Sequence, residues 1–268
     1  MRTSQFFTLL FVALSSTLQG AEPIQLRVLS YNIHHGQGVD GKLDLNRIAN
    51  VILSVKPDLV ALQEVDQHAA RTGSIDQPAE LERRTKMSVV FGANIELQGG
   101  HYGNALLSRF PITRHKNHLL PNIDNGEQRG VIDAEIELPN TSQKVRLLAT
   151  HFDHRPHEAE RLASAKMIND LAAKSPELPT LLAGDLNATP DSQTLQQLKI
   201  SWLRANETPL PTSPVQTPTR QIDFILYRPA LRWRVLEVKV LDEAIASDHR
   251  PLLAVFELLP RSPDVDED

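Results

Sequence analysis

The stretch Thr180-Leu181-Leu182-Ala183-Gly184-Asp185-Leu186-Asn187 carries the most information about the fold. Its apolar residues form a continuous run of strand length, which is typical of a strand covered on both faces. Asp185 and Asn187 follow this run, and residues two apart on an extended chain point to the same side. The stretch therefore predicts a buried strand that ends in two polar side chains directed at one site.

Five further segments share this arrangement, in which a polar side chain ends, opens or interrupts an apolar run. They are Val28 to Asn32, Val60 to Glu64, Leu147 to His151, Gln221 to Leu226 around Asp223, and Ala246 to His249. A single acid or histidine at a strand end is more often a turn residue or a satisfied core group. Six such segments in one chain favour a functional site instead, because open α/β folds collect their ligands at the carboxyl ends of strands.

The rest of the chain alternates between strand-like and helix-like patterns. We expect strands at 24–33, 59–65, 89–97, 104–112, 131–138, 145–152, 180–186, 222–227, 233–241 and 251–258, and helices at 45–55, 79–87, 158–173 and 194–198. The alternation at 131–138 predicts a strand with one wet face. Helices are too few to cover every strand of a regular parallel barrel, so two sheets packed face to face with helices outside fit better.

The composition limits the chemistry that this chain can perform. A net charge of −5 argues against tight binding to duplex DNA, because such proteins usually carry a basic stripe. The absence of cysteine excludes disulfides, thiolate zinc sites and a cysteine nucleophile. A catalytic metal would therefore use oxygen and imidazole ligands, which favours magnesium, calcium or manganese.

The two ends of the chain differ from its body. Residues 1–21 combine Arg2 with an apolar run from Phe6 to Leu14 and a small or polar stretch, which is the pattern of a signal peptide. The run is too short to span a bilayer comfortably, since a spanning helix needs about 20 apolar residues. We therefore expect an exported protein, periplasmic or secreted, with its domain at 22–260. The acidic residues 261–268 are expected to be a disordered tail.

Seven short runs, taken in order, resemble those of the endonuclease/exonuclease/phosphatase superfamily, which includes DNase I, exonuclease III-type repair nucleases, sphingomyelinases and inositol phosphatases. The runs are Ser30-Tyr31-Asn32-Ile33, Leu62-Gln63-Glu64-Val65, Gly103 to Arg109, Thr150-His151-Phe152, Gly184-Asp185-Leu186-Asn187, Gln221-Ile222-Asp223-Phe224 and Ser247 to Pro251. The combination of Gly-Asp-x-Asn with a late Ser-Asp-His is specific. The resemblance implies a four-layer α/β/β/α sandwich and a phosphoesterase that directs water at a phosphodiester with the help of a metal.

The resemblance also implies roles for individual residues. Glu64, Asn32 and Asp248 would bind a divalent metal, most readily Mg²⁺, with Mn²⁺ or Ca²⁺ as alternatives. Attacking water must lose a proton, and His249 and Asp185 are the two candidates for the base that accepts it. The family pattern leaves this choice open.

Five further residues complete the predicted site. Asp223 would orient His249 and raise its basicity. His151 would donate to a phosphate oxygen or to the leaving group, and Asn187 would hold the phosphate or the water. Asn104 and Arg129 are candidates for substrate binding. For Asn104 a strand-edge hydrogen bond is an equally good interpretation, and for Arg129 an ion pair with an acid is favoured over contact with a phosphate.

Several positions stay open. DNase-type members pair the histidine equivalent to His151 with an upstream glutamate, and nothing in the sequence selects between Glu80 and Glu82 for that part. His34 and His35 come soon after Asn32, which would allow one of them to reach the cleft, but we expect adjacent loop histidines to be solvent-exposed or to support the site from outside.

The motifs identify phosphate and metal but not the group attached to the phosphate. Extracellular nucleic acid, a lipid headgroup and a small phosphoester all remain alternatives, because no basic cluster and no aromatic-rich membrane loop is present. We expect a monomer without a stable protein partner. The competing hypothesis is a binding module that keeps the fold without catalysis; since every expected position is filled, an enzyme is favoured.

Overall fold

The computed structural model describes residues 23–123, 125–139 and 143–260. The predicted leader at 1–21 and the predicted acidic tail at 261–268 lie outside these described residues. Within the described ranges, no helix combines the length and the apolar character that crossing a membrane requires.

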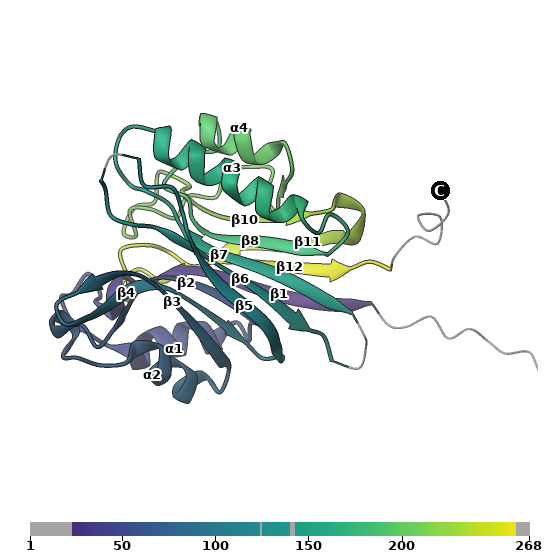
Figure 1. Ribbon diagram of the computed structural model, residues 1–268. Helices are drawn as coiled ribbons and strands as arrows, with labels where there is room; N and C mark the ends of the chain where they lie inside the picture. Colours follow the sequence, from purple (N-terminus) through teal and green to yellow (C-terminus); the bar gives the residue numbers. More distant parts are fainter. Residues whose placement is uncertain (1–22, 124, 140–142, 261–268) are drawn as a thin grey trace, which may run out of the picture.

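Two six-stranded sheets pack face to face, and helices cover their outer faces (Figure 1). The first sheet has the order β11-β12-β1-β2-β4-β3, from β1 (Ile24–Asn32), β2 (Leu59–Gln67), β3 (Ser88–Leu97), β4 (Gly100–Ser108), β11 (Trp233–Val240) and β12 (Leu252–Leu258). The second has the order β5-β6-β7-β8-β10-β9, from β5 (Ile112–Leu119), β6 (Gly130–Glu137), β7 (Lys144–His151), β8 (Thr180–Asp185), β9 (Leu203–Arg204) and β10 (Asp223–Arg228).

Four α-helices of the described chain form the outer layers. Helices α1 (Leu45–Ser54) and α2 (Gln77–Thr85) cover the first sheet, and α3 (Ala159–Ala173) and α4 (Gln193–Lys199) cover the second (Figure 1). Short 3₁₀ turns occur at η1 (His34–Gly36), η2 (Ala70–Thr72) and η3 (Ala230–Arg232). The predicted four-layer α/β/β/α sandwich is confirmed.

Three buried apolar clusters hold the four layers together. One lies between the sheets and includes Leu147, Ile225 and Phe256. A second joins the first sheet to α1, and a third joins the second sheet to α3 and α4. Continuous apolar runs such as the one in β8 follow from this arrangement, because a strand in the middle of four layers is covered on both faces.

Local signals set the ends of α1. The Asp44 carboxylate accepts a hydrogen bond from the backbone N–H of Arg47 at 3.0 Å, which satisfies one of the free donors at the helix start. The helix buries Ile48 and Ile52 and ends before Pro57. Both limits agree with the sequence prediction.

The strand expected at 104–112 is wrong. β4 ends at Ser108, and β5 begins at Ile112 on the other sheet. Pro111 lies in the connection, where its lack of an N–H suits a break between two strands. β5 was missed because it is an edge strand with mostly exposed polar residues, so it lacks the apolar pattern that marks a core strand.

The wet face expected for 131–138 is only partly present, because Glu137 is exposed and Glu135 half-buried but Asp133 is not solvated. Asp133 of β6 is only 7% exposed and binds Arg146 of β7 through two contacts of 2.6 Å. Arg146 also donates to the carbonyl of Leu171 in α3 at 3.0 Å. The alternating acid is therefore the buried partner of a cation beneath α3, not a solvated side chain.

Parallel pairing brings the predicted site residues to one end of the sandwich. β1 pairs in parallel with β2, and β7 pairs in parallel with β8. Asn32, His151 and Asp185 therefore end β1, β7 and β8, and Glu64 directly follows Gln63, the last residue of β2 that pairs with β1.

Candidate active site

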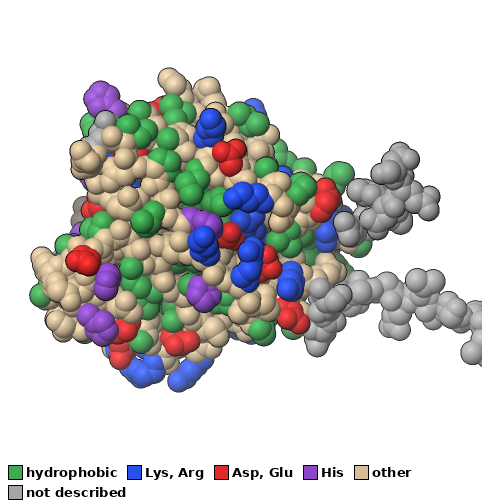
Figure 2. Space-filling view, viewed as in Figure 1, with side chains coloured by type: hydrophobic (Ala, Val, Ile, Leu, Met, Phe, Trp, Pro, Cys, Tyr) green, Lys and Arg blue, Asp and Glu red, His purple; other side chains and the backbone are tan. Residues whose placement is uncertain are grey.

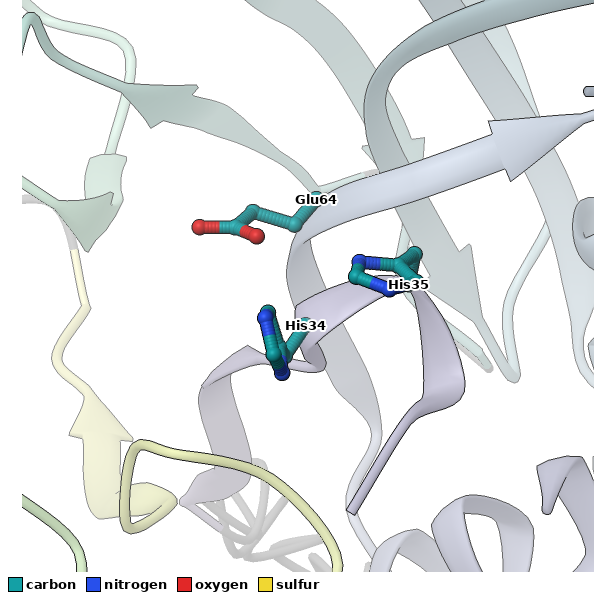
Figure 3. A group of neighbouring side chains, drawn as sticks. All are labelled: His34, His35 and Glu64. Carbon is teal, nitrogen blue, oxygen red and sulfur yellow. The ribbon is translucent and has the colours of Figure 1, made fainter. Parts of the chain in front are cut away.

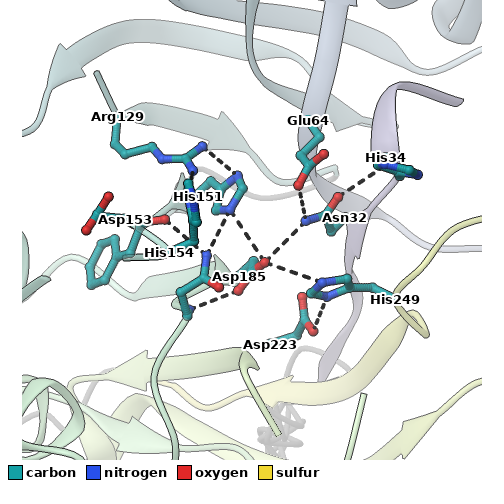
Figure 4. A network of polar contacts seen from close by, with 12 residues as sticks. Asn32, His34, Glu64, Arg129, His151, Asp153, His154, Asp185, Asp223 and His249 are labelled. Carbon is teal, nitrogen blue, oxygen red and sulfur yellow. Dashed lines mark hydrogen bonds and ion pairs between the residues drawn. The ribbon is translucent and has the colours of Figure 1, made fainter. Parts of the chain in front are cut away.

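Residues from both sheets converge in one polar network (Figure 4). Asn32 and Glu64 enter from the first sheet, and His249 enters from the loop before β12. His151 and Asp185 enter from the second sheet. These predicted residues, which are far apart in the sequence, therefore lie together in the structure, as expected.

Asp185 lies at the middle of the network and is 1% exposed. Its Oδ1 accepts a hydrogen bond from the backbone N–H of Asn187 at 2.9 Å. Its Oδ2 accepts one from Asn32 Nδ2 at 3.2 Å and lies 3.5 Å from His151 Nε2 and 3.8 Å from His249 Nε2. One carboxylate oxygen thus faces three of the predicted residues.

Asp223 holds His249 from the opposite side. Its Oδ2 lies 2.9 Å from His249 Nδ1 and accepts a hydrogen bond from Thr212 Oγ1 at 2.5 Å. The imidazole therefore stands between two buried carboxylates, those of Asp223 and Asp185. This is the orientation predicted for the pair of Asp223 and His249.

This packing of charges shifts two pKa values. Burial and the neighbouring Asp223 carboxylate raise the pKa of Asp185 to about 7. Burial by itself lowers the pKa of His249, but the charges of Asp223 and Asp185 outweigh it and raise that pKa to about 10. At neutral pH the imidazole of His249 is therefore protonated, and Asp185 holds a proton more readily than an ordinary aspartate.

Nδ1 of His151 contacts a cation, Arg129, and not an acid. Arg129 Nη1 lies 3.2 Å from His151 Nδ1 and 2.6 Å from Glu127 Oε1. Burial, together with the charge of Arg129, lowers the pKa of His151 well below its usual value. Nδ1 of the ring faces the Arg129 donor, and Nε2 lies 3.5 Å from Asp185 Oδ2 and 3.0 Å from Asn187 Nδ2, which also donates to the carbonyl of Phe152 at 3.1 Å.

Neither glutamate considered for a DNase-like pair contacts His151. Glu80 pairs with Arg83 at 2.9 Å and Arg84 at 3.0 Å on α2. Glu82 accepts a hydrogen bond from the backbone N–H of Val89 at 3.2 Å. Arg129 occupies the position beside His151 instead.

Glu64 lies in a β-bulge, where the pairing of β2 with β4 shifts between Leu62 and Val65. Its φ of 59° is left-handed, which is uncommon for a residue other than glycine, and bulges of this kind redirect side chains. Asn32 Nδ2 donates to Glu64 Oε1 at 2.9 Å, and Asn32 Oδ1 accepts from the N–H of His34 at 3.1 Å. In this arrangement Asn32 orients Glu64 and Asp185 with its amide group.

A cavity of about 340 Å³ opens beside this network. Among the predicted residues, Glu64, Asp248 and Arg129 line it. Residues that the sequence analysis did not assign to the site also line it, namely His34, Arg71, Ile95, Leu97, Tyr102, Glu127 and His154. The cavity wall therefore carries two arginines together with the carboxylates of Glu64, Glu127 and Asp248.

Arg71 is the most informative of the residues that sequence reasoning missed. It binds the fully buried Asp66 with two contacts of 2.7 and 2.8 Å, and its guanidinium lies 5.3 Å from the centre of the Tyr102 ring. It belongs to η2, which follows no apolar run and fits no motif. Its burial partner Asp66, two residues after Glu64, is the sequence signal that could have indicated it.

Asn104 lies outside the cavity wall and is 1% exposed. Its Nδ2 donates to the carbonyl of Gly130 at 2.9 Å, which links β4 of the first sheet to β6 of the second. This contact corresponds to the structural interpretation of Asn104 given above.

A comparison with known protein families shows to which family the chain belongs. Residues 29–249 match the Endonuclease/Exonuclease/phosphatase family. The chain belongs to this family. Members of the family are hydrolases that act on phosphoester bonds.

Similar proteins and solved structures match most of the chain. The Escherichia coli K12 protein YbhP, described as uncharacterized, is 29% identical over 88% of this chain and 98% of its own length. A family structure from Beutenbergia cavernae is 25% identical, with a TM-score of 0.75 over 87% of this chain and 72% of that one. A Bacteroides thetaiotaomicron mannosyl-6-phosphatase shares the fold, with 18% identity and a TM-score of 0.73 over 86% and 99% of the two chains.

The donor atoms present fit the divalent metal that the endonuclease/exonuclease/phosphatase family generally uses. Glu64 and Asp248 are half-buried carboxylates on the cavity wall, and oxygen donors of this kind suit Mg²⁺, Mn²⁺ and Ca²⁺. Ligand atoms of Asp185, Asp223 and His249 also lie within 4.8 Å of one another, although the short contact of Asp223 with His249 already uses Nδ1 of that ring.

Proposed function

We propose that this chain is an exported, divalent-metal-dependent phosphoesterase that directs water at the phosphorus of a phosphate ester. The observation that carries the proposal is the position of Asp185, whose Oδ2 lies between Asn32, His151 and His249 beside a cavity bordered by Glu64 and Asp248. Such a site combines a proton acceptor, hydrogen-bond donors and metal ligands around one small volume.

Glu64 and Asp248 are the residues that would hold the metal, with Asn32 fixing the orientation of Glu64. Mg²⁺ is the proposed ion, and Mn²⁺ and Ca²⁺ are the alternatives. When bound, a divalent ion supplies positive charge that stabilises negative charge building up on the phosphate oxygens.

Asp185 is the proposed acceptor of the proton from water. At neutral pH His249 is protonated between two carboxylates, so it lacks the free lone pair that a base needs. The pKa of Asp185, about 7, suits a group that takes up a proton at that pH. His249 then acts as a fixed positive charge that keeps Asp185 in place.

Donors beside Asp185 and at the cavity wall would bind the phosphate. His151 presents its Nε2 toward Asp185 and Asn187, whose Nδ2 lies 3.0 Å from that nitrogen. Arg129 lies at the cavity wall next to Glu127 and His154, where a substrate phosphate would compete with Glu127 for the guanidinium.

The size and charge of the cavity favour a compact phosphoester. A volume of about 340 Å³ with Arg71 and Arg129 on its wall accommodates a small headgroup or a sugar phosphate. On the face seen in Figure 2, Lys and Arg side chains are interspersed with Asp and Glu side chains. Arg114 and Glu135 form one such pair, with an N–O distance of 2.7 Å. The mannosyl-6-phosphatase of the same fold supports this preference.

Export is the remaining part of the proposal. It is supported by the leader pattern of residues 1–21, in which a basic residue precedes a short apolar run. Fractionation of cells that express the full chain tests it, because export predicts removal of the leader and recovery outside the cytoplasm.

The decisive experiment measures hydrolysis of a chromogenic bis-aryl phosphate and of the corresponding mono-aryl phosphate. We expect turnover that EDTA abolishes and added Mg²⁺ or Mn²⁺ restores, and that Asp185→Asn reduces by about 100-fold or more. The exposed Asp191→Asn is the matched control. Absence of metal-restored turnover on these esters and on a panel of DNA, RNA, phospholipid and sugar phosphates would leave the non-catalytic binding module as the better hypothesis.

A further inference from the structure

A second group of possible metal ligands lies on the far side of Glu64 from Asp185. His34 and His35 belong to η1, and ligand atoms of these two residues and Glu64 lie within 4.8 Å of one another. Figure 3 shows both imidazole rings on one side of the Glu64 side chain. All three residues are partly exposed, so an ion can reach them from solvent.

Both imidazoles are oriented by Gln37 in a way that frees one nitrogen of each ring. His34 Nδ1 lies 3.2 Å from the backbone carbonyl of Gln37, so Nδ1 carries the proton and Nε2 keeps a lone pair. His35 Nε2 lies 3.1 Å from Gln37 Oε1, and the amide of Gln37 is itself fixed because its Nε2 donates to the carbonyl of Gly41 at 3.2 Å. The proton of His35 is therefore on Nε2.

The remaining nitrogen of His35 is buried and lacks a partner. Its Nδ1 has no hydrogen bond among the described residues, although burial of a polar atom without a partner is unfavourable. Histidines that bind metals usually donate their second ring N–H to a carbonyl or carboxylate, which fixes the tautomer. His34 and His35 both show this arrangement, with Gln37 as the common acceptor.

Backbone strain at the same three residues supports a shared role. The φ angles of His34, His35 and Glu64 are 45°, 43° and 59°. A left-handed conformation costs about 1–2 kcal/mol for a residue with a side chain, and such strain is concentrated at functional sites. Here the strained segments of η1 and of the β2 bulge turn three donor side chains toward one another.

We propose that His34 Nε2, His35 Nδ1 and Glu64 bind a divalent transition-metal ion of the Mn²⁺, Co²⁺ or Zn²⁺ class. Imidazole ligands favour these ions over Mg²⁺ and Ca²⁺, which prefer oxygen alone. Two donors on one ion lie at most about 4 Å apart, and ligand atoms of the three side chains already lie within 4.8 Å of one another, so a small approach of the side chains would complete the set. The proposal deepens the proposed function and rests on it only through Glu64, the ligand common to both.

Hydrogen bonds also connect the proposed metal site to the carboxylate of Asp185. The N–H of His34 donates to Asn32 Oδ1, and Asn32 Nδ2 donates to both Glu64 and Asp185. An ion held by His34 therefore fixes the amide that orients Asp185. Loss of either histidine is expected to weaken transition-metal binding without removing Asp185 or His249.

The test is a titration of the metal-free, full-length protein with Co²⁺, followed by calorimetry and by the visible absorption of the bound ion. We expect His34→Asn and His35→Asn to weaken Co²⁺ binding at least 10-fold and to change its spectrum, and Gln37→Ala to weaken it about 10-fold. Asparagine tolerates a left-handed backbone, so these variants should keep the fold, which thermal melting checks. The exposed His115→Asn is the matched control.

A second measurement needs no variant. Pulsed EPR of the wild-type protein with bound Mn²⁺ should show nitrogen couplings from imidazole; an oxygen-only environment overturns the proposal, as does wild-type Co²⁺ affinity in both histidine variants. If Co²⁺ binding requires the histidines but the protein has no phosphoesterase turnover, the metal site is supported and the proposed function is contradicted. If turnover depends on a metal whose ligands are all oxygen atoms, the proposed function is supported and the histidine site is contradicted.

Discussion

Nδ1 of His249 lies 2.9 Å from Oδ2 of Asp223, and Nε2 of the same ring lies 3.8 Å from Oδ2 of Asp185. One imidazole therefore separates two buried carboxylates that come from neighbouring strands, since Asp223 and Asp185 are paired across β10 and β8. When this ring is protonated, its positive charge reduces the repulsion between the two carboxylates.

Replacing Asp223 by asparagine should remove the charge that holds the proton on His249. We expect Asp223→Asn to lower the pKa of His249 and to reduce kcat/KM by about 100-fold or more, with a smaller effect on KM. NMR titration of the His249 ring together with steady-state kinetics measures both effects. An unchanged pKa in a folded variant would show that Asp223 does not set the protonation of His249.

The raised pKa of His249 predicts how stability depends on pH in the presence of EDTA. The folded protein binds this proton up to about pH 10, whereas the unfolded chain releases it near the ordinary value of 6.5. The stabilising contribution is therefore complete below pH 6.5 and is lost as the pH rises through 10.

Melting temperatures between pH 7.5 and 10 test this dependence, because the titration of Asp185, with a pKa of about 7, is then largely finished. We expect a steeper fall in the wild type than in His249→Gln, by several degrees over this range, given about 2–4 °C per kcal/mol for a chain of this size. Parallel curves for the two proteins would contradict the shift, since lysines and tyrosines contribute equally to both.

Arg129 should affect substrate binding more than the chemical step. Arg129→Gln removes a guanidinium from the cavity wall and leaves His151 Nδ1 without its donor. We expect KM for a phosphate ester to rise about 10-fold and inhibition by inorganic phosphate to weaken by a similar factor, as for the loss of one charged hydrogen bond. Arg114→Gln, on the exposed edge strand β5, serves as the control and should leave both quantities unchanged.

Phe256 should be important for joining the two sheets. It belongs to β12, is fully buried, and its ring lies 5.5 Å from that of Trp233 in the first sheet and 5.7 Å from that of Tyr227 in the second. Phe256→Ala should lower the free energy of unfolding by about 3–5 kcal/mol because it leaves a cavity between the layers. Urea denaturation measures this value, and Leu231→Ala at an 82% exposed position should change it by less than about 0.5 kcal/mol.

The sequence was sufficient for elements whose environment is uniform along their length. β8 was predicted because an unbroken apolar run fits a strand with cover on both faces, and α1 because its apolar spacing and Asp44 agree. β5 was not predicted, since an exposed edge strand has no core pattern. Asp133 was misassigned to solvent because an alternating acid looks the same whether it meets water or a buried Arg146.

In the candidate site, too, some features could be predicted from the sequence and others could not. Motif spacing indicated Glu64, Asp185 and His249, since strand ends and family runs are visible in the sequence. The contact of Arg129 with His151, and the frame that Gln37 provides for two imidazoles, depend on rotamers and tautomers. Those are set by tertiary contacts, which periodicity and composition do not record.

The division of the site between the sheets has a mechanical consequence. Asn32, Glu64 and His249 move with one sheet, and His151, Asp185 and Asp223 move with the other. Their mutual distances are therefore fixed by the thickness of the apolar layer between the sheets. A substitution that swells or thins this layer by a fraction of an ångström would misalign the two halves while both remain folded. Turnover should thus respond to interlayer spacing before any spectroscopic sign of denaturation.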